Sequence, residues 1–207
     1  MKTLNVAVIL AVIVIVFTTI SCTNKDGSEQ RTGIDGRSRS GSDVLQVAKQ
    51  VVEAFNAKDG KKLAFLAHPE KGVRFSTSAY VDVASDVVIS RAQIETFWTD
   101  SKIYTWGLAD GTGDPINMTP NQYCREYIMN RDFLKPTSIN VNNDQATGNT
   151  RNNAAVVYPN GTRVEYYIKP TTGEDRAELD WAALRLVFER SGGSWFLVGV
   201  IHDEWTI

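Results

Sequence analysis

The C-terminal part of the chain alternates apolar and polar residues with a period of two, and this pattern restricts the fold more than any other feature. Four such runs are separated by turn residues: Ala154–Tyr158 and Thr162–Lys169 flank Pro159-Asn160-Gly161, and Ala183–Arg190 and Trp195–Trp205 flank Ser191-Gly192-Gly193-Ser194. Asn-Gly and Gly-rich turns between apolar runs are strong hairpin signals. The sequence therefore predicts consecutive antiparallel strands at this end of the domain.

The residues before these runs follow mainly helical spacing. The expected segments are a helix from Val44 that ends at Asp59-Gly60, a shorter helix over Lys61–Ala67, an extended stretch over Val73–Val83, and two helices that begin with capping boxes at Ser90/Gln93 and Thr119/Gln122. The polar run from Asn140 to Asn153 is expected to be a solvent loop. Helices first and strands later predict an α+β fold, with N-terminal helices packed on a curved antiparallel sheet.

The N-terminus has the pattern of an export signal. Val6–Phe17 is an unbroken run of twelve apolar residues, and Ile20-Ser21-Cys22 follows. A helix of twelve residues spans roughly 18 Å, which is short of the hydrocarbon core of a bilayer. The end of the run resembles a bacterial lipobox, although Thr19 stands where Leu or Val is usual. We expect residues 1–21 to be a lipoprotein signal peptide and Cys22 to carry the lipid, with an uncleaved anchor over Leu4–Ile20 as the alternative.

Residues 22–42 have the composition of a tether. Positions 23–42 hold four Gly, four Ser and a single large apolar residue, Ile34. Such a segment cannot bury enough surface to offset its ordering entropy. We therefore expect a lipidated Cys22 with a disordered tether, followed by one domain over residues 43–207. The expected location is the bacterial cell envelope, on the outer side of the cytoplasmic membrane or on the outer membrane.

Charge and cysteine content exclude several classes of protein. Of 22 basic residues one lies in the leader, so 21 remain against 24 acidic residues, a net charge of −3. A nucleic-acid binder needs a basic face, so no nucleic-acid partner is expected. With Cys22 lipidated, Cys124 is expected to be a small buried hydrophobe. Zinc and phosphate-loop motifs do not occur, and Pro115 stands where an EF-hand loop needs glycine, so neither a metal nor a cofactor is expected.

Three stretches carry a family resemblance: HPEKGVRFS from His68, YTWGLADGTGDPI from Tyr104, and IHDEWTI at the end of the chain. With the long first helix, the short second helix and the long final strands, they resemble the NTF2-like superfamily (the SnoaL and ketosteroid-isomerase cone fold), and in particular bacterial secreted lipoproteins assigned to it. The resemblance covers about residues 44–207 and implies a cone-shaped α+β domain. It implies no particular activity, because this fold hosts enzymes, binding modules and adaptors.

Five residues form the candidate ligand site: His68, Arg74, Tyr80, His202 and Trp205. In a cone of this type they would surround one mouth and supply a cation, two imidazoles, a phenol and a stacking surface. That set suits a small, partly anionic or aromatic ligand. The alternative is that Arg74 pairs with an acid such as Asp82 and that both histidines are hydrogen-bonded core residues.

The last strand yields two more expectations. Alternation places His202 on one face and Asp203 on the other, so the two are not expected to form a catalytic dyad, and no catalytic residue is assigned. Both faces of the strand are apolar, and the helices can cover only one. We expect the outer face to form a homodimer interface, with a loop such as Thr171–Asp180 folding over it as the alternative.

Three functions follow from these features. The first is a membrane-tethered, non-catalytic lipoprotein that binds a small ligand or an envelope partner. The second is an acid–base enzyme of isomerase, dehydratase or hydrolase type that uses a pocket His or Asp. The third is a structural assembly subunit. The first is favoured, because the sequence has an anchor and a tether and no recognisable catalytic set.

We predict that Cys22→Ala releases or misprocesses the protein, because the lipid is attached through the thiol of this residue. Mass spectrometry of the N-terminal peptide from the membrane fraction checks this. A terminus at acylated Cys22 is expected in the unmodified chain, and an intact Met1 terminus in the same fraction would contradict the prediction.

Overall fold

The computed structural model describes residues 36–143, 150–170 and 180–205. The expected signal peptide, the lipidated Cys22 and the first part of the tether lie outside the described residues. The helices are α1 (Gly36–Ala57), α2 (Gly60–Leu66), α3 (Arg91–Ile94), α4 (Pro120–Tyr123), the π-helical turn η1 (Cys124–Ile128) and α5 (Ala154–Val157). The strands are β1 (Val73–Ser76), β2 (Val87–Ile89), β3 (Tyr104–Leu108), β4 (Pro115–Met118), β5 (Ser138–Val141), β6 (Thr162–Ile168), β7 (Ala182–Ser191) and β8 (Ser194–Glu204).

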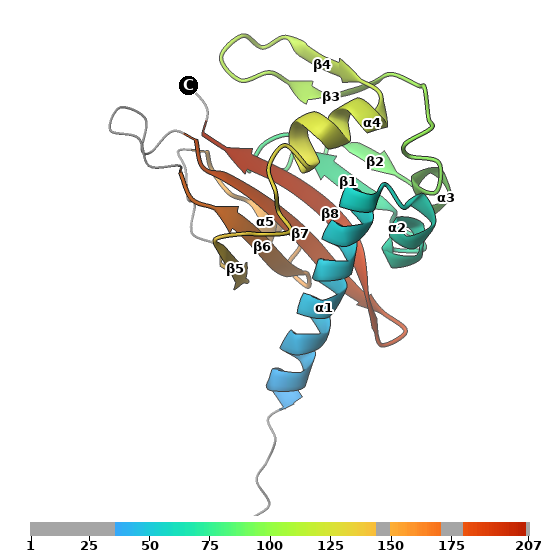
Figure 1. Ribbon diagram of the computed structural model, residues 1–207, viewed down its shortest axis with the longest axis vertical. Coiled ribbons are helices and arrows are strands. Elements are labelled where there is room, and N and C mark those ends of the chain that lie inside the picture. Colours follow the sequence, from blue (N-terminus) through green and yellow to red (C-terminus); the bar gives the residue numbers. More distant parts are fainter. Residues whose placement is uncertain (1–35, 144–149, 171–179, 206–207) are drawn as a thin grey trace, which may run out of the picture. The chain divides into compact units, whose positions relative to one another are not determined.

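Six strands form one sheet in the order β2-β1-β8-β7-β6-β5. Its neighbours pair antiparallel except for β1 and β8, which run parallel. Figure 1 shows α1 crossing one face of this sheet, while β3 and β4 form a separate hairpin beyond the end of β8. The structure confirms the α+β class, with N-terminal helices packed on a curved antiparallel sheet.

The apolar stripe of α1 packs against the inner face of the sheet, as its spacing predicts. Val44, Val51 and Phe55 are almost fully buried together with Phe75 of β1 and Leu184 of β7. The capping boxes at Ser90/Gln93 and Thr119/Gln122 are also confirmed, since each side chain pair bonds reciprocally with the backbone. Cys124 is buried, and burial raises the pKa of its thiol to about 12. It is a buried hydrophobe, as expected.

The outer face of the sheet is covered in part by the chain itself. A second apolar cluster contains Val187, Val198 and Ile201 of the sheet and joins them to Val81 and Tyr158 from outside it. The loop over residues 77–86 and the segment around α5 provide this cover. The apolar outer face was the reason to expect a homodimer there, and at these positions it is already buried. The alternative cover, Thr171–Asp180, falls almost wholly outside the described residues.

A β-bulge in β8 decides which side chains share a face. Val187 pairs with Gly199 and Phe188 pairs with Leu197, so Val198 is an extra residue without a partner of its own. Leu197 and Val200 therefore both lie in the core against α1, and Val198 lies in the outer cluster. The strict alternation expected from Trp195 to Trp205 is wrong at this point.

The space beside the bulge is taken by Tyr158. A Cβ atom on Gly199 would lie 3.0 Å from the hydroxyl oxygen of Tyr158 and 3.2 Å from a methyl group of Val187. The absence of a side chain at Gly199 therefore lets the hydroxyl end of Tyr158 approach the outer face closely.

Two expectations for the strands are corrected. Ala154–Tyr158 does not form a strand, because residues 154–157 make the helical turn α5, whose first N–H is bonded by the Asn152 side chain. The strand that pairs with β6 on this side is instead β5, whose last two residues, Asn140 and Val141, fall in the run expected to be a polar loop. Ile139 and Val141 alternate with polar residues there, a short strand pattern that the surrounding asparagines conceal.

The first helix and the first strand also differ from expectation. Helix α1 begins at Gly36 rather than at Asp43, so it extends into the segment assigned to the tether. Once a helix is nucleated, each added residue gains a hydrogen bond without needing tertiary contacts. The extended stretch over Val73–Val83 is a strand only to Ser76 and continues as a loop. Among the described residues, no helix combines the length and apolarity needed to cross a bilayer.

We predict that Asn153→Ala destabilises the domain by about 1–3 kcal/mol, the range for leaving buried backbone groups unpaired. The Asn153 side chain accepts from the N–H of Val81 at 2.7 Å and donates to its carbonyl at 2.9 Å, so it clamps the covering loop to α5. Urea unfolding checks this. The exposed Asn160→Ala is the matched control and should change stability by less than about 0.5 kcal/mol. Equal effects from both variants would contradict a clamp.

Candidate functional site

The candidate site is a cavity beside the end of β8, here called the β8-end cavity. Strand β1 stops at Ser76, opposite Ile201, so β8 runs on without a neighbour on that side over residues 202–204. A cavity of about 730 Å³ opens there, between this free edge, the loop after β1 and the β3–β4 hairpin. It is lined by Thr77, Ser78, Leu108, Ala109, Asp110, Gly111, Thr112, Ile116, Tyr127, Thr150, His202, Asp203 and Glu204.

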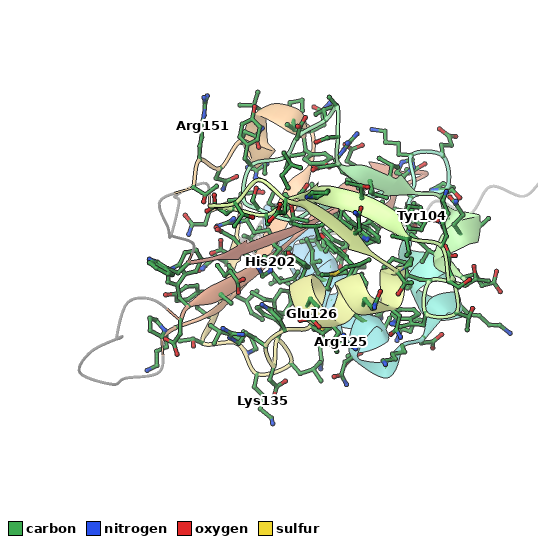
Figure 2. The ribbon with its side chains drawn as sticks, turned by 90° about the horizontal axis from the view of Figure 1, so that it is seen from above. Tyr104, Arg125, Glu126, Lys135, Arg151 and His202 are labelled. Atoms are coloured by element: carbon green, nitrogen blue, oxygen red, sulfur yellow. The ribbon has the colours of Figure 1, made fainter. Side chains whose placement is uncertain are left out.

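His202 and Glu204 form a pair on the inner side of this cavity. The Nε2 atom of His202 lies 3.3 Å from Oε1 of Glu204, and its ring stands edge-on to that of Tyr127 with centroids 5.4 Å apart. Figure 2 places His202 among the strands, with Arg125 and Glu126 on the neighbouring helical turn. Both ring nitrogens of His202 are covered by the surrounding protein. The imidazole therefore forms part of the wall and does not present a nitrogen to the cavity.

Glu204 presents a carboxylate that is held from two sides. Asn130 donates from Nδ2 to Oε2 of Glu204 at 3.0 Å, and His202 approaches the other oxygen. The hydrogen bond with His202 holds the pKa of Glu204 below its ordinary value, against the opposing effect of burial. Glu204 is thus an oriented anion at neutral pH, at a partly exposed position in the cavity.

Asp203 belongs to a buried ionic cluster on the opposite face of β8. Its Oδ2 lies 2.8 Å from Nη2 of Arg185, whose Nε donates to Oε2 of Glu165 at 2.6 Å. Asn140 donates to the other Glu165 oxygen at 3.3 Å. Burial raises the pKa of Asp203, and the Arg185 charge partly offsets this. His202 and Asp203 therefore lie on opposite faces of β8, as the alternation predicts, and do not form a dyad.

This cluster was missed by the sequence analysis. Glu165 and Arg185 lie directly opposite each other in the β6–β7 ladder, and Arg185 lies opposite Ile201 in β8. One signal was present, because Arg185 interrupts an otherwise apolar strand run. The pairing register that brings a carboxylate to it cannot be read from a single strand.

His68 is a structural residue in this fold. Its backbone N–H donates to the carbonyl of Leu197, and its Nδ1 accepts from the N–H groups of Glu70 and Lys71 at 3.2 and 3.1 Å. The side chain is 4% exposed and packs on Phe196. Leu197 is five residues before His202, roughly 17 Å along a strand. The two histidines therefore do not share a site.

Arg74 holds the covering loop rather than a ligand. Its Nη1 donates to the carbonyls of Val83 and Asp86 at 3.1 and 3.3 Å. The Asp86 carboxyl accepts from the Asp82 N–H at 3.1 Å and from the Ser76 hydroxyl. Arg74 is thus held by backbone carbonyl groups of this loop, whereas the alternative drawn from the sequence was a pair with an acid such as Asp82.

Tyr80 and Trp205 are both partly exposed, and neither lines the β8-end cavity. Of the five candidate residues only His202 does so. The structure therefore does not gather the five around one mouth, because the extended stretch that was to carry Tyr80 is a loop over the outer face. Within the described part of the chain, His, Cys, Asp and Glu side chains form no group of three that could hold a metal ion.

Comparisons with known proteins concern the fold. Neither family models nor curated protein sequences give a match. Solved structures with a distant resemblance to the chain include proteins whose titles name NTF2. One is described as an NTF2-like protein with a cystatin-like fold from Novosphingobium aromaticivorans; it is 13% identical with a TM-score of 0.41, over 86% of this chain and 92% of that one.

Two further structures are similar to a lesser degree. A Xanthomonas campestris protein described as a calcium/calmodulin dependent protein kinase II association domain is 13% identical, with a TM-score of 0.36 over 83% of this chain and 90% of that one. An NTF2 variant with five substitutions is 12% identical, with a TM-score of 0.36, over 79% of this chain and 98% of that one. At these values the α+β architecture rests on the chain's own strand order and helix packing.

We predict that Asp86 makes the stability of the domain fall as pH rises from about 4 to about 6. Burial raises the pKa of Asp86 from 3.8 to about 6, with Ser76 and Arg74 opposing the rise. Between these values the folded chain keeps a proton that the unfolded chain releases, so stability is greatest at the acid end of this range. Each unit of difference in pKa corresponds to about 1.4 kcal/mol.

Asp86→Asn removes this pH-dependent contribution. The free energy of unfolding of the variant minus that of the parent should therefore increase as pH rises through the range. Urea midpoints at pH 4, 5, 6 and 7 measure it. Asp132→Asn, at an exposed position paired only with Lys135, is the matched control. A difference between the Asp86 variant and the parent that does not change with pH would contradict the prediction.

Proposed function

We propose that this domain is a non-catalytic binding module whose β8-end cavity takes a small polar ligand that is cationic or neutral. The observation that carries the proposal is the charge of the lining. Asp110 and Glu204 contribute carboxyl groups, Asp203 being paired with the buried Arg185, and none of the residues that the structure places in the wall is Lys or Arg. An ammonium group opposite Glu204 would complete an ion pair with a carboxylate that is already oriented.

The neutral part of the lining fits the same ligand class. Thr77, Ser78, Thr112 and Tyr127 bring hydroxyl groups that donate and accept, while Leu108 brings an apolar surface. The neighbouring Arg125 is not among the residues that line the cavity, and its Nε lies 2.8 Å from Oε1 of Glu126. This revises the ligand expected from the sequence, which was anionic or aromatic because Arg74 was placed at the mouth.

An acid–base enzyme is the second candidate, and the His202–Glu204 pair is the observation that favours it. A histidine beside a carboxylate in a cavity is a common source of a general base. Against this, a base must reach the proton it removes, and both nitrogens of His202 are covered. Incubating the protein with each ligand and following the ligand by NMR separates the two functions. A binding module leaves the ligand unchanged, and an enzyme converts it at a rate that His202→Gln abolishes.

We further propose that the domain is held at the bacterial cell envelope by a lipid on Cys22. The support is the sequence of residues 1–22 alone, which lie outside the described residues. A tethered binding domain of this kind would sample ligand outside the cytoplasm without diffusing away.

We predict that amines stabilise the full-length protein in thermal-shift assays, whereas carboxylates with the same carbon skeleton do not. Asp110→Asn and Glu204→Gln should each weaken the best amine about tenfold, the effect of losing one hydrogen bond to a charged group. Asp132→Asn removes a carboxylate outside the cavity and serves as control. Carboxylates that bind as well as their amine counterparts, or Asp110 and Glu204 variants that bind like the control, would contradict the proposal.

A further inference from the structure

A second hollow lies on the same side of the sheet as α1, and its lining has a basic side chain where that of the β8-end cavity has carboxylates. It has a volume of about 500 Å³ and opens between the first half of α1, the segment that precedes β5, and the edge of the sheet. We call it the α1–β5 pocket. Its walls include Leu45, Lys49, Phe133, Leu134, Ile139 and Tyr166.

The walls of this pocket are apolar and incompletely covered. Leu134 is 42% exposed and Ile139 is 46% exposed, and Leu45 faces them from α1. Ile139 is exposed because β5 is the outermost strand of the sheet and has a neighbour on one side only. Large apolar side chains that gather around one hollow, rather than being scattered singly, mark a place where something apolar binds.

The described lining carries one charged side chain, Lys49, and the Glu53 carboxylate lies beside it on α1. Lys49 is the only ionisable group besides the Tyr166 phenol among the described lining residues. Burial raises the pKa of Tyr166 to about 12, so the phenol stays neutral. The Nζ atom of Lys49 lies 3.8 Å from Glu53 in an exposed i,i+4 pair. Such pairs contribute little, so the ammonium group is available to another anion.

We propose that the α1–β5 pocket binds a single-chain amphiphile with a carboxylate head, its chain between Leu45 and Leu134 and its head at Lys49. The apolar walls favour an alkyl chain, and the charge of Lys49 favours an anionic head. A polar cation would gain nothing from either feature. This site is separate from the β8-end cavity and does not depend on the function proposed for that cavity.

Isothermal titration of the full-length chain with decanoate, decanol and decylamine, all below their micelle concentrations, tests the proposal. Decanoate should bind, decanol should bind more weakly, and decylamine should bind least. Lys49→Gln should weaken decanoate about threefold, the order expected for one exposed ion pair, and leave decanol unchanged. Lys61→Gln, on the exposed side of α2, is the matched control.

Leu134→Asp places a carboxylate in the apolar wall and should abolish decanoate binding without unfolding, because the side chain is already partly exposed. Decylamine binding that is as tight as that of decanoate and is lost in Leu134→Asp would overturn the proposal, and so would a Lys49 variant that binds decanoate like the Lys61 control. Sedimentation velocity then measures whether the chain forms a dimer through this pocket. A dimer that Leu134→Asp dissociates would show that a second copy of the chain covers these walls, and would also overturn it.

Discussion

The bulge at Val198 in β8 is the constraint on which the β8-end cavity depends. Because β8 pairs with β1 on one side and β7 on the other, its register fixes the faces of the whole sheet. One extra residue shifts the alternation by one position. His202 and Glu204 thereby point to the α1 side, and Asp203 points to the buried Arg185 on the other face.

The two hollows differ in the charge of the residues that line them. Strand β8 runs past its neighbour β1 beside the β3–β4 hairpin, and Glu204 at its end lines the cavity together with Asp110. The edge at β5 gathers apolar residues because a terminal strand leaves side chains half covered, and only Lys49 contributes charge. One sheet therefore presents an acidic polar cavity at the end of a strand and an apolar pocket with a basic rim at its edge.

The sequence predicted the local elements well and the site poorly. The stripe from Val44 to Phe55 and both capping boxes depend on neighbours within one turn, so periodicity was sufficient. Strand β5 was hidden by asparagines, and α5 was assigned as a strand, because pairing partners rather than composition decide such short segments. Arg74 and His68 have the chemistry of a ligand site, but backbone groups several residues away engage them, and only the folded loop reveals this.

The most direct measurement is a titration of the full-length chain, followed by ¹H–¹⁵N correlation spectra, with the amine that stabilises it most. Binding in the β8-end cavity predicts saturable shifts at Ser78, Asp110 and Glu204, with Leu134 and Ile139 unmoved. Saturable shifts at the α1–β5 pocket instead, or no saturable shift at the three cavity residues, would contradict the assignment of the cavity as the ligand site.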